Sequence, residues 1–161
     1  IQAALTGHLV FSTLHTNDAS SAITRLIDMG IEPFLVSSSV RAIIAQRLIR
    51  LLCTNCKQPY VPDKTQIKNW GLNQSGLTEG KLYKACGCDQ CLNTGYRGRS
   101  GIYEFLSLSD TIRSLLLRTS DSHQILQAAQ EEGMRTLRQD GLLKVLAGKT
   151  SINEVLRVTQ V

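Results

Sequence analysis

The sequence predicts an α/β fold that is interrupted by a small cysteine-rich module and followed by a helical C-terminal segment. Three observations lead to this prediction. An apolar run at 9–14 precedes two segments with helical periodicity, all five cysteines lie between residues 53 and 91, and the last 40 or so residues have the pattern of short capped helices. The chain has 161 residues, which suits one domain or a domain with a small appendage.

The first predicted element is a strand at Leu9–Leu14. This run, LVFSTL, is short, apolar and partly β-branched, as is typical of a buried strand in a parallel sheet. A polar turn follows, and Asn17 or Asp18 can cap a helix that ends at Gly30. The apolar positions of that helix follow its period: Ala19, Ala22, Ile23, Leu26 and Ile27.

A second helix is expected to begin at Pro33, a residue that suits the first position of a helix. Its apolar stripe contains Val36, Val40, Ile43 and Ile44. From Gln46 to Leu52 the pattern fits either a continued helix or a buried strand, and we favour a strand. Residues 1–52 are therefore expected to form part of an α/β core.

Residues 53–99 form a separate module that contains two Cys-x-x-Cys pairs. Cys53 and Cys56 form the first pair, Cys88 and Cys91 form the second, and 31 residues lie between them. Two such pairs supply the four thiolates of a tetrahedral Zn²⁺ site with no open position for a substrate, so we expect structural zinc. Cys86 lies outside the pairs and is predicted to be a spare thiol. The alternative is that the cysteines are unliganded or oxidised.

Regular structure returns after the module. Residues 100–118 are expected to form a strand, with Ile102, Glu104 and Leu106 on one face, and then a helix that Ser109 or Asp110 caps. Residues 119–161 are expected to form a helical subdomain with helices near 121–132, 136–147 and 151–158.

Gly148-Lys149-Thr150 matches the end of a phosphate-binding loop, but the rest of that motif is missing. The earlier glycine would stand at position 143, which is Leu143, and a helix rather than a strand is predicted before it. Gly148 is better explained as a helix C-cap and Thr150 as the next N-cap. The sequence therefore predicts no phosphate loop in this chain.

Two groups of polar residues are candidates for binding an anion. His8 and His15 flank the apolar run, and His15 falls at the carboxyl end of the predicted strand, where open α/β sheets bind ligands. Arg97 and Arg99 flank a glycine in a predicted turn and can present guanidinium groups to phosphate or carboxylate. The alternatives are histidines with a structural hydrogen bond and a solvated loop. His123 is expected on the surface.

The net charge of +5 and a pI near 9.1 fit contact with phosphate, nucleic acid or anionic lipid without choosing among them. A nucleic-acid-binding zinc ribbon and a protein-docking module both remain alternatives. No apolar run approaches the roughly 18 residues that span a bilayer, and no charged n-region precedes a hydrophobic segment at the start, so we expect neither an anchor nor a signal peptide within this chain. The sequence starts at Ile1 within an apparent structural element, so we expect a fragment of a longer protein.

Six segments, in order along the chain, share a pattern with one known family. They are Thr6–Ala19, Ala45–Leu48, Gly95–Ile102, Gly133–Leu137, Asp140–Gly141 and Gly148–Val155. Together they resemble the secretion ATPase family that powers type II secretion and type IV pilus assembly, and Thr6–Ala19 looks like the histidine box of that family. The tetracysteine module favours secretion and pilus-extension ATPases over retraction ATPases, which lack it.

The resemblance implies the carboxyl part of a RecA-like P-loop NTPase motor domain. In that family the phosphate loop and Walker B segment precede the histidine box, so the intact protein would use ATP and Mg²⁺ and this chain alone would be inactive. His15 and His8 would be catalytic, sensing or stabilising the γ-phosphate, and Thr13, Arg97 and Arg99 would contact the nucleotide. The intact protein would be a homo-hexamer on the cytoplasmic face of a bacterial inner membrane, bound to platform proteins and not to nucleic acid.

Overall fold

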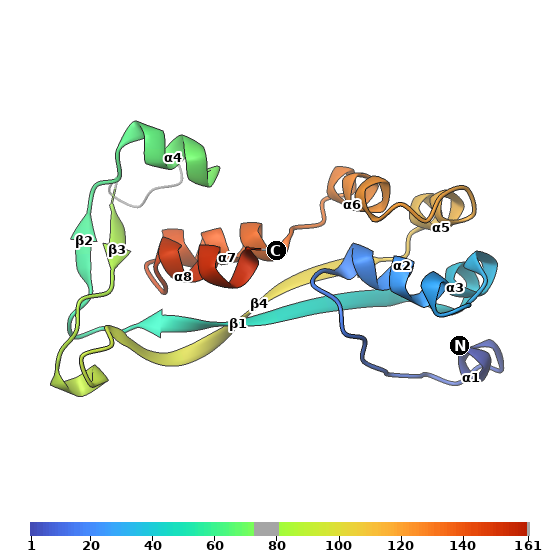
Figure 1. Cartoon of the computed structure of the whole chain (residues 1–161), viewed down its shortest axis with the longest axis horizontal. Helices are drawn as coiled ribbons and strands as arrows, with labels where there is room; N and C mark the ends of the chain where they lie inside the picture. The colour runs from blue at the N-terminus through green and yellow to red at the C-terminus, as the bar shows by residue number, and fades with distance from the viewer. Residues whose placement is uncertain (73–80, 161) are drawn as a thin grey trace. The chain divides into compact units, whose positions relative to one another are not determined.

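The computed structural model describes residues 1–72 and 81–160, and its elements fall into two units (Figure 1). Unit 1 consists of Ile1–Gln46 and Tyr103–Thr136, and unit 2 of Arg47–Ile102 and Leu137–Val161. The mixed helix and strand content agrees with the prediction, whereas the described strands pair antiparallel and not in the parallel sheet that was expected. The four segments expected from the sequence remain a prediction, although the cysteine-rich module shares unit 2 with the last helices. No helix in the described ranges is long and apolar enough to cross a membrane.

Two long strands, β1 (Ala42–Leu52) and β4 (Tyr96–Ser107), pair with each other and contribute residues to both units (Figure 1). The backbone N–H of Leu108, just past β4, donates to the carbonyl of Arg41, just before β1, at 3.1 Å. At the other end the N–H of Cys53 donates to the carbonyl of Gly95 at 2.9 Å. Because the start of one strand meets the end of the other, the pair is antiparallel.

The helices of unit 1 begin and end near the positions that their capping residues predict. Asp18 caps α2 (Ala19–Asp28) by accepting the Ser21 N–H at 2.7 Å, and Ser109 caps α5 (Asp110–Leu116). Gly30 follows α2 with φ +88°, a conformation that glycine adopts without strain. The other helices of the unit are α1 (Gln2–Leu5), α3 (Pro33–Ser39) and α6 (Ser122–Glu131).

The core of unit 1 forms where the inward face of β4 meets these helices. Ile23 from α2, Leu106 from β4 and Ile112 from α5 are fully buried there. The predicted alternation on β4 is confirmed, because Glu104 and Leu106 are buried whereas Tyr103 and Phe105 are exposed.

The predicted strand at Leu9–Leu14 is wrong for the described residues, since 8–16 have no regular structure. Leu9 is 79% exposed and Phe11 is 88% exposed. A buried parallel strand needs strands beside it and helices over both faces, and the four strands of the described part of the chain pair only as β1 with β4 and β2 with β3. The apolar run therefore lacks the neighbours that would make it a strand.

The second helix also ends earlier than predicted. Its apolar stripe was expected to include Ile43 and Ile44, but α3 ends at Ser39 and both isoleucines lie in β1. Their β-branched side chains suit a strand, and pairing with β4 settles the choice. The strand expected within Gln46–Leu52 is confirmed as part of β1.

In unit 2 the last two helices pack on the insertion between the cysteine pairs. The insertion contains β2 (Gln58–Tyr60), α4 (Lys64–Trp70) and β3 (Leu82–Lys84), and β2 pairs antiparallel with β3. Its core joins the insertion to α7 (Leu137–Leu146) and α8 (Ile152–Thr159) through these buried residues: Ile67, Leu72, Leu82, Leu142, Val145, Ile152 and Val155. A Cβ on Gly141 would lie 2.6 Å from Val155 Cγ1, so only glycine allows this approach of α7 to α8.

The turn between α7 and α8 corrects one prediction. Gly148, with φ +64°, follows α7 as expected, but the N-cap of α8 is Ser151 and not Thr150. The Thr150 side chain is fully buried, and its hydroxyl donates to the carbonyl of Arg50 at 2.7 Å. Tertiary contact with β1 therefore takes the hydroxyl that was expected to cap the helix.

Glu154 of α8 is 1% exposed and is held by several hydrogen bonds and ion pairs. It accepts hydrogen bonds from the Arg50 backbone N–H at 3.0 Å and from the guanidinium groups of Arg50 and Arg157, each at 2.7 Å. The Arg50 guanidinium also lies 4.2 Å from the centroid of the Tyr96 ring. Burial alone would raise the pKa of Glu154, but the two arginines outweigh it and lower the pKa to about 2.

Glu154→Gln should lower the free energy of unfolding by about 2–3 kcal/mol at pH 7, because both arginines lose their counter-charge. The native pKa lies below the unfolded value, so the carboxylate contributes fully above about pH 4.5 and its contribution declines as the pH falls toward 2. Urea unfolding at several pH values measures both effects. Glu131→Gln, at an exposed glutamate of α6, is the control. A destabilisation that persists unchanged at pH 2 would contradict the assignment.

Candidate functional site

The first cysteine pair lies in a tight turn at the end of β1. The Cys53 carbonyl accepts the backbone N–H groups of Cys56 at 3.4 Å and of Lys57 at 3.0 Å. This turn directs both side chains to the same side of the backbone, as a metal-binding knuckle requires. The hydrogen bond from Cys53 to Gly95 holds the turn beside the second pair.

The second pair is formed by a 3-10 turn, η3 (Asp89–Cys91), and a left-handed reversal after it. Leu92 and Asn93 have φ values of 52° and 58°, and Gly95 has φ 74°. A Cβ on Gly95 would lie 2.7 Å from the Cβ of Ala85, so glycine is required there for close backbone approach as well as for its conformation. The strained reversal returns the chain to β4 with both sulfurs facing the first pair.

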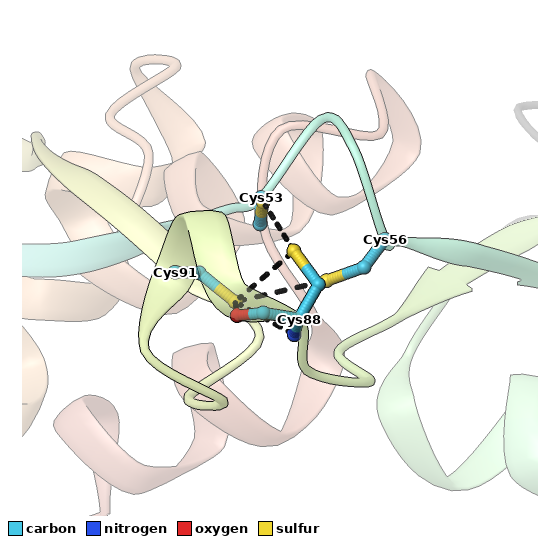
Figure 2. A group of neighbouring side chains, drawn as sticks. All are labelled: Cys53, Cys56, Cys88 and Cys91. Atoms are coloured by element: carbon cyan, nitrogen blue, oxygen red, sulfur yellow. Dashed lines mark hydrogen bonds between the residues drawn. The ribbon is translucent and has the colours of Figure 1, made fainter.

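The four predicted cysteines come together in one cluster (Figure 2). The Sγ atoms of Cys53 and Cys88 lie 3.9 Å apart, and that of Cys91 lies 3.8 Å from those of Cys56 and Cys88. All four sulfurs lie within 4.8 Å of one another. In a tetrahedron with metal–sulfur bonds of about 2.3 Å the sulfurs are about 3.8 Å apart. The cluster therefore has the size and donor set of a four-thiolate metal site.

Hydrogen-bond donors around the cluster favour thiolate at two positions. Burial opposes ionisation of Cys91, but the N–H groups of Cys88 and Gly95 donate to its sulfur and lower its pKa to about 6. The side-chain amide of Asn55 donates to the Cys88 sulfur at 3.3 Å and lowers the pKa of that thiol. Burial raises the pKa of Cys56 to about 12. A bound cation would favour the thiolate form of all four groups.

Cys86 is exposed and lies outside this cluster. Cys53 and Cys91 are buried, and Cys56 and Cys88 are partly exposed. Four protein sulfurs fill a tetrahedral coordination shell, so a metal held here has no position for water or substrate. The arrangement can crosslink the end of β1 to the start of β4, and it offers no route to hydrolysis.

The structure places His8, Thr13 and His15 on the exposed segment before α2. His8 Nδ1 lies 3.0 Å from the hydroxyl of Thr6. His15 was expected at the carboxyl end of a strand, but the described residues form no strand there. The segment therefore presents all three side chains to solvent in unit 1.

Arg97 and Arg99 were expected in a turn but lie within β4, on its exposed part. Gly98 between them has φ +80° and interrupts the regular backbone of the strand. Both arginines belong to unit 2, whereas the two histidines of the predicted catalytic pair belong to unit 1. His123 is exposed at the start of α6, as predicted.

Three polar residues to which the sequence analysis gave no functional role make polar contacts or are buried in the structure. Asn55 contacts a cysteine sulfur, Glu154 fastens α8 to β1, and Glu104 is 2% exposed in unit 1. The sequence signal for Glu104 is its position: it is a charged residue between Ile102 and Leu106 on what is predicted to be the inward face of a strand. Glu154 has a local partner in Arg157, but its other partner, Arg50, lies more than 100 positions away, and no local pattern reveals that contact.

Comparison with known proteins matches residues 1–157 to the family model described as Type II/IV secretion system protein. The chain is 46% identical over 158 residues to the Type IV pilus assembly ATPase PilB of Thermus thermophilus, covering 98% of this chain and 18% of that protein. It is 49% identical over 160 residues to Type II secretion system protein E of Pseudomonas aeruginosa. It is 50% identical over 161 residues to Type II secretion system ATPase E of Vibrio cholerae. Each of these last two matches covers 99% of this chain and 31% of the relative.

Cys88→Ser should abolish tight metal binding, because it removes one of four ligands and the N–H donors around it cannot replace a thiolate. Cys86→Ser should keep one metal ion per chain. Metal content of the purified protein, measured by mass spectrometry, checks both variants. Retention of metal by Cys88→Ser together with its loss from Cys86→Ser would show that the ligand set is wrong.

Proposed function

The chain belongs to the family of type II/IV secretion system proteins, and from this premise we propose that it is the carboxyl part of an ATP-hydrolysing motor that powers type II secretion or type IV pilus assembly. The observation that carries the proposal is the family match over residues 1–157. This match confirms the resemblance to the secretion ATPase family that the sequence segments indicated. Relatives named as ATPases of both systems share about half of the residues of this chain.

We propose that the ATP-binding machinery lies in a part of the protein outside this chain. The chain spans less than a third of the length of the relatives described above, and Gly148-Lys149-Thr150 follows a helix rather than a strand. The exposed apolar run 9–14 supports this proposal, because Leu9 and Phe11 are costly to leave in water. Elements of a RecA-like core outside this chain would cover these apolar side chains.

Structural zinc is the metal that best fits the cysteine cluster. Zn²⁺ favours four thiolates in a tetrahedron, and the sulfur spacing of 3.8–3.9 Å fits its bond length. Cys53, Cys56, Cys88 and Cys91 would hold the ion, which would supply a crosslink and no reaction chemistry. Loss of the ion would separate the second cysteine pair from the end of β1. The start of β4, which follows that pair, would then be less firmly held.

The proposed catalytic contribution of this chain is to the γ-phosphate of ATP. The His15 imidazole, aided by His8, would donate a hydrogen bond to the phosphate oxygens as negative charge develops there. Thr13 would lie beside them, and Arg97 and Arg99 would contact nucleotide or a neighbouring subunit. Phosphate cradling and Mg²⁺ placement would remain with the other part of the protein.

We propose that the intact protein is a homo-hexamer that acts on the cytoplasmic face of a bacterial inner membrane, against platform proteins of the secretion or pilus machinery. A nucleic-acid-binding zinc ribbon fits the structure less well. Lys57, a cation next to the first cysteine pair, donates to the Gly148 carbonyl at 2.9 Å and lies 4.4 Å from the centroid of the Tyr83 ring. It is thus committed to internal packing, and no nucleic acid is expected.

His15→Ala in the intact protein should lower kcat for ATP hydrolysis about 100-fold, because a donor to transition-state charge is lost. The exposed His123→Ala is the matched control and should leave kcat unchanged. Steady-state phosphate release at saturating ATP measures the effect, with metal content and unfolding midpoint as checks of folding. Equal rates for wild type and both variants would remove the catalytic role of His15.

The isolated chain should release no phosphate from ATP and should not bind ATP with micromolar affinity, because it lacks a loop of backbone N–H groups around the phosphates. Calorimetric titration with Mg-ATP and a phosphate-release assay check both statements. Turnover, or tight binding that Lys149→Ala abolishes, would show that Gly148-Lys149-Thr150 is a phosphate loop after all.

A further inference from the structure

Glu104 is a buried carboxylate on the inward face of β4 in unit 1. It is 2% exposed, and its neighbour Leu106 on the same face is fully buried in the apolar core. Burial of a carboxylate is costly unless hydrogen-bond donors compensate it. An apolar side chain would fill the same position at no such cost, so the partners of Glu104 explain its presence better than packing does.

The Oε1 atom of Glu104 accepts the backbone N–H of Ala19 at 2.8 Å, across 85 positions of sequence. Ala19 is fully buried and is the first residue of α2. The first N–H groups of a helix have no partner within the helix, and the helix dipole favours a negative charge beside them. Glu104 therefore satisfies a donor that neither water nor the helix itself can reach.

A short polar turn at residues 16–18 leads into α2 and is also held by hydrogen bonds. The Thr16 hydroxyl donates to the Asp18 carbonyl at 3.1 Å. The Asp18 carboxylate accepts the Ser20 hydroxyl at 2.9 Å and the Ser21 N–H at 2.7 Å. These bonds are local, within three residues of one another. The bond from Glu104 is different, because it fastens the turn to a strand elsewhere in the unit.

His15 immediately precedes this turn and is exposed on a segment without regular structure. Residues 8–16 have no regular structure of their own, and on the C-terminal side of His15 the chain is held where α2 begins. We propose that Glu104 is a positioning residue that fixes the start of α2 and, through it, the place of the His15 imidazole. This inference rests on the proposed function, in which His15 contacts the γ-phosphate.

Two substitutions in the intact protein separate the charge from the hydrogen bond. Glu104→Gln keeps an oxygen acceptor and loses the charge, whereas Glu104→Leu loses both and leaves the Ala19 N–H unpaired. Hydrogen exchange of the peptide that covers residues 15–21 should quicken about 5-fold in Glu104→Gln and at least 10-fold in Glu104→Leu. Glu131→Gln, at an exposed glutamate of α6, should change nothing.

Kinetics test whether the positioning acts through His15. kcat for ATP hydrolysis should be highest in the wild type, lower in Glu104→Gln and lowest in Glu104→Leu. KM for ATP should stay unchanged, because phosphate cradling and Mg²⁺ placement lie in another part of the protein and Glu104 itself does not contact nucleotide. Combining Glu104→Leu with His15→Ala should lower kcat no further than His15→Ala alone. A general loss of folding would instead lower kcat additively and reduce the unfolding midpoint.

Three results would overturn the inference: unchanged exchange in Glu104→Gln, an unchanged kcat in a variant with faster exchange, or additive losses in the double variant. If Glu104→Leu does not fold, Glu104→Gln decides alone. If the proposed function is wrong, His15→Ala will leave kcat unchanged. Hydrogen exchange of residues 15–21 will still report whether Glu104 holds the start of α2, so the two failures can be told apart.

Discussion

The antiparallel pairing of β1 with β4 is the interaction on which the rest of the structure depends. Its hydrogen bond from Cys53 to Gly95 sets the two cysteine pairs against each other, although 31 residues separate them in sequence. The same strands supply Leu106 to the core of unit 1 and the Arg50 contact to α8 in unit 2. A long two-stranded ribbon is marginal by itself, and helices of both units pack against these strands. A metal ion in the cysteine cluster would add a crosslink between them.

Buried carboxylates fasten these two strands to helices in a similar way. Glu154 of α8 accepts the backbone N–H of Arg50 in β1, and Glu104 of β4 accepts the backbone N–H of Ala19 in α2. Apolar packing tolerates small slides between elements, whereas a buried hydrogen bond to a backbone group has one geometry. Each carboxylate thus defines the position of one helix against one strand, at a cost in desolvation that its donors offset.

The chemistry available to this chain divides between a closed centre and an open segment. The cysteine cluster has all four donors from protein and can only hold structure. Residues 8–16 carry the exposed side chains of His8, Thr13 and His15, and the apolar side chains of Leu9 and Phe11 are exposed beside them. This combination fits the proposed motor, in which the segment would be covered and would meet the phosphate only in the intact protein.

Local sequence by itself determined where several helices begin or end and which four cysteines lie together. Asp18, Gly30, Pro33 and Ser109 act at the positions that capping rules predict, because their effects depend on backbone groups within a few residues. The cysteine pairs likewise depend on short turns. The tertiary structure alone decided that 9–14 is exposed, that Ile43 and Ile44 enter a strand, and that Thr150 bonds to Arg50 instead of capping α8. Strand pairing and buried polar contacts join residues far apart in sequence, and only the folded chain brings their partners together.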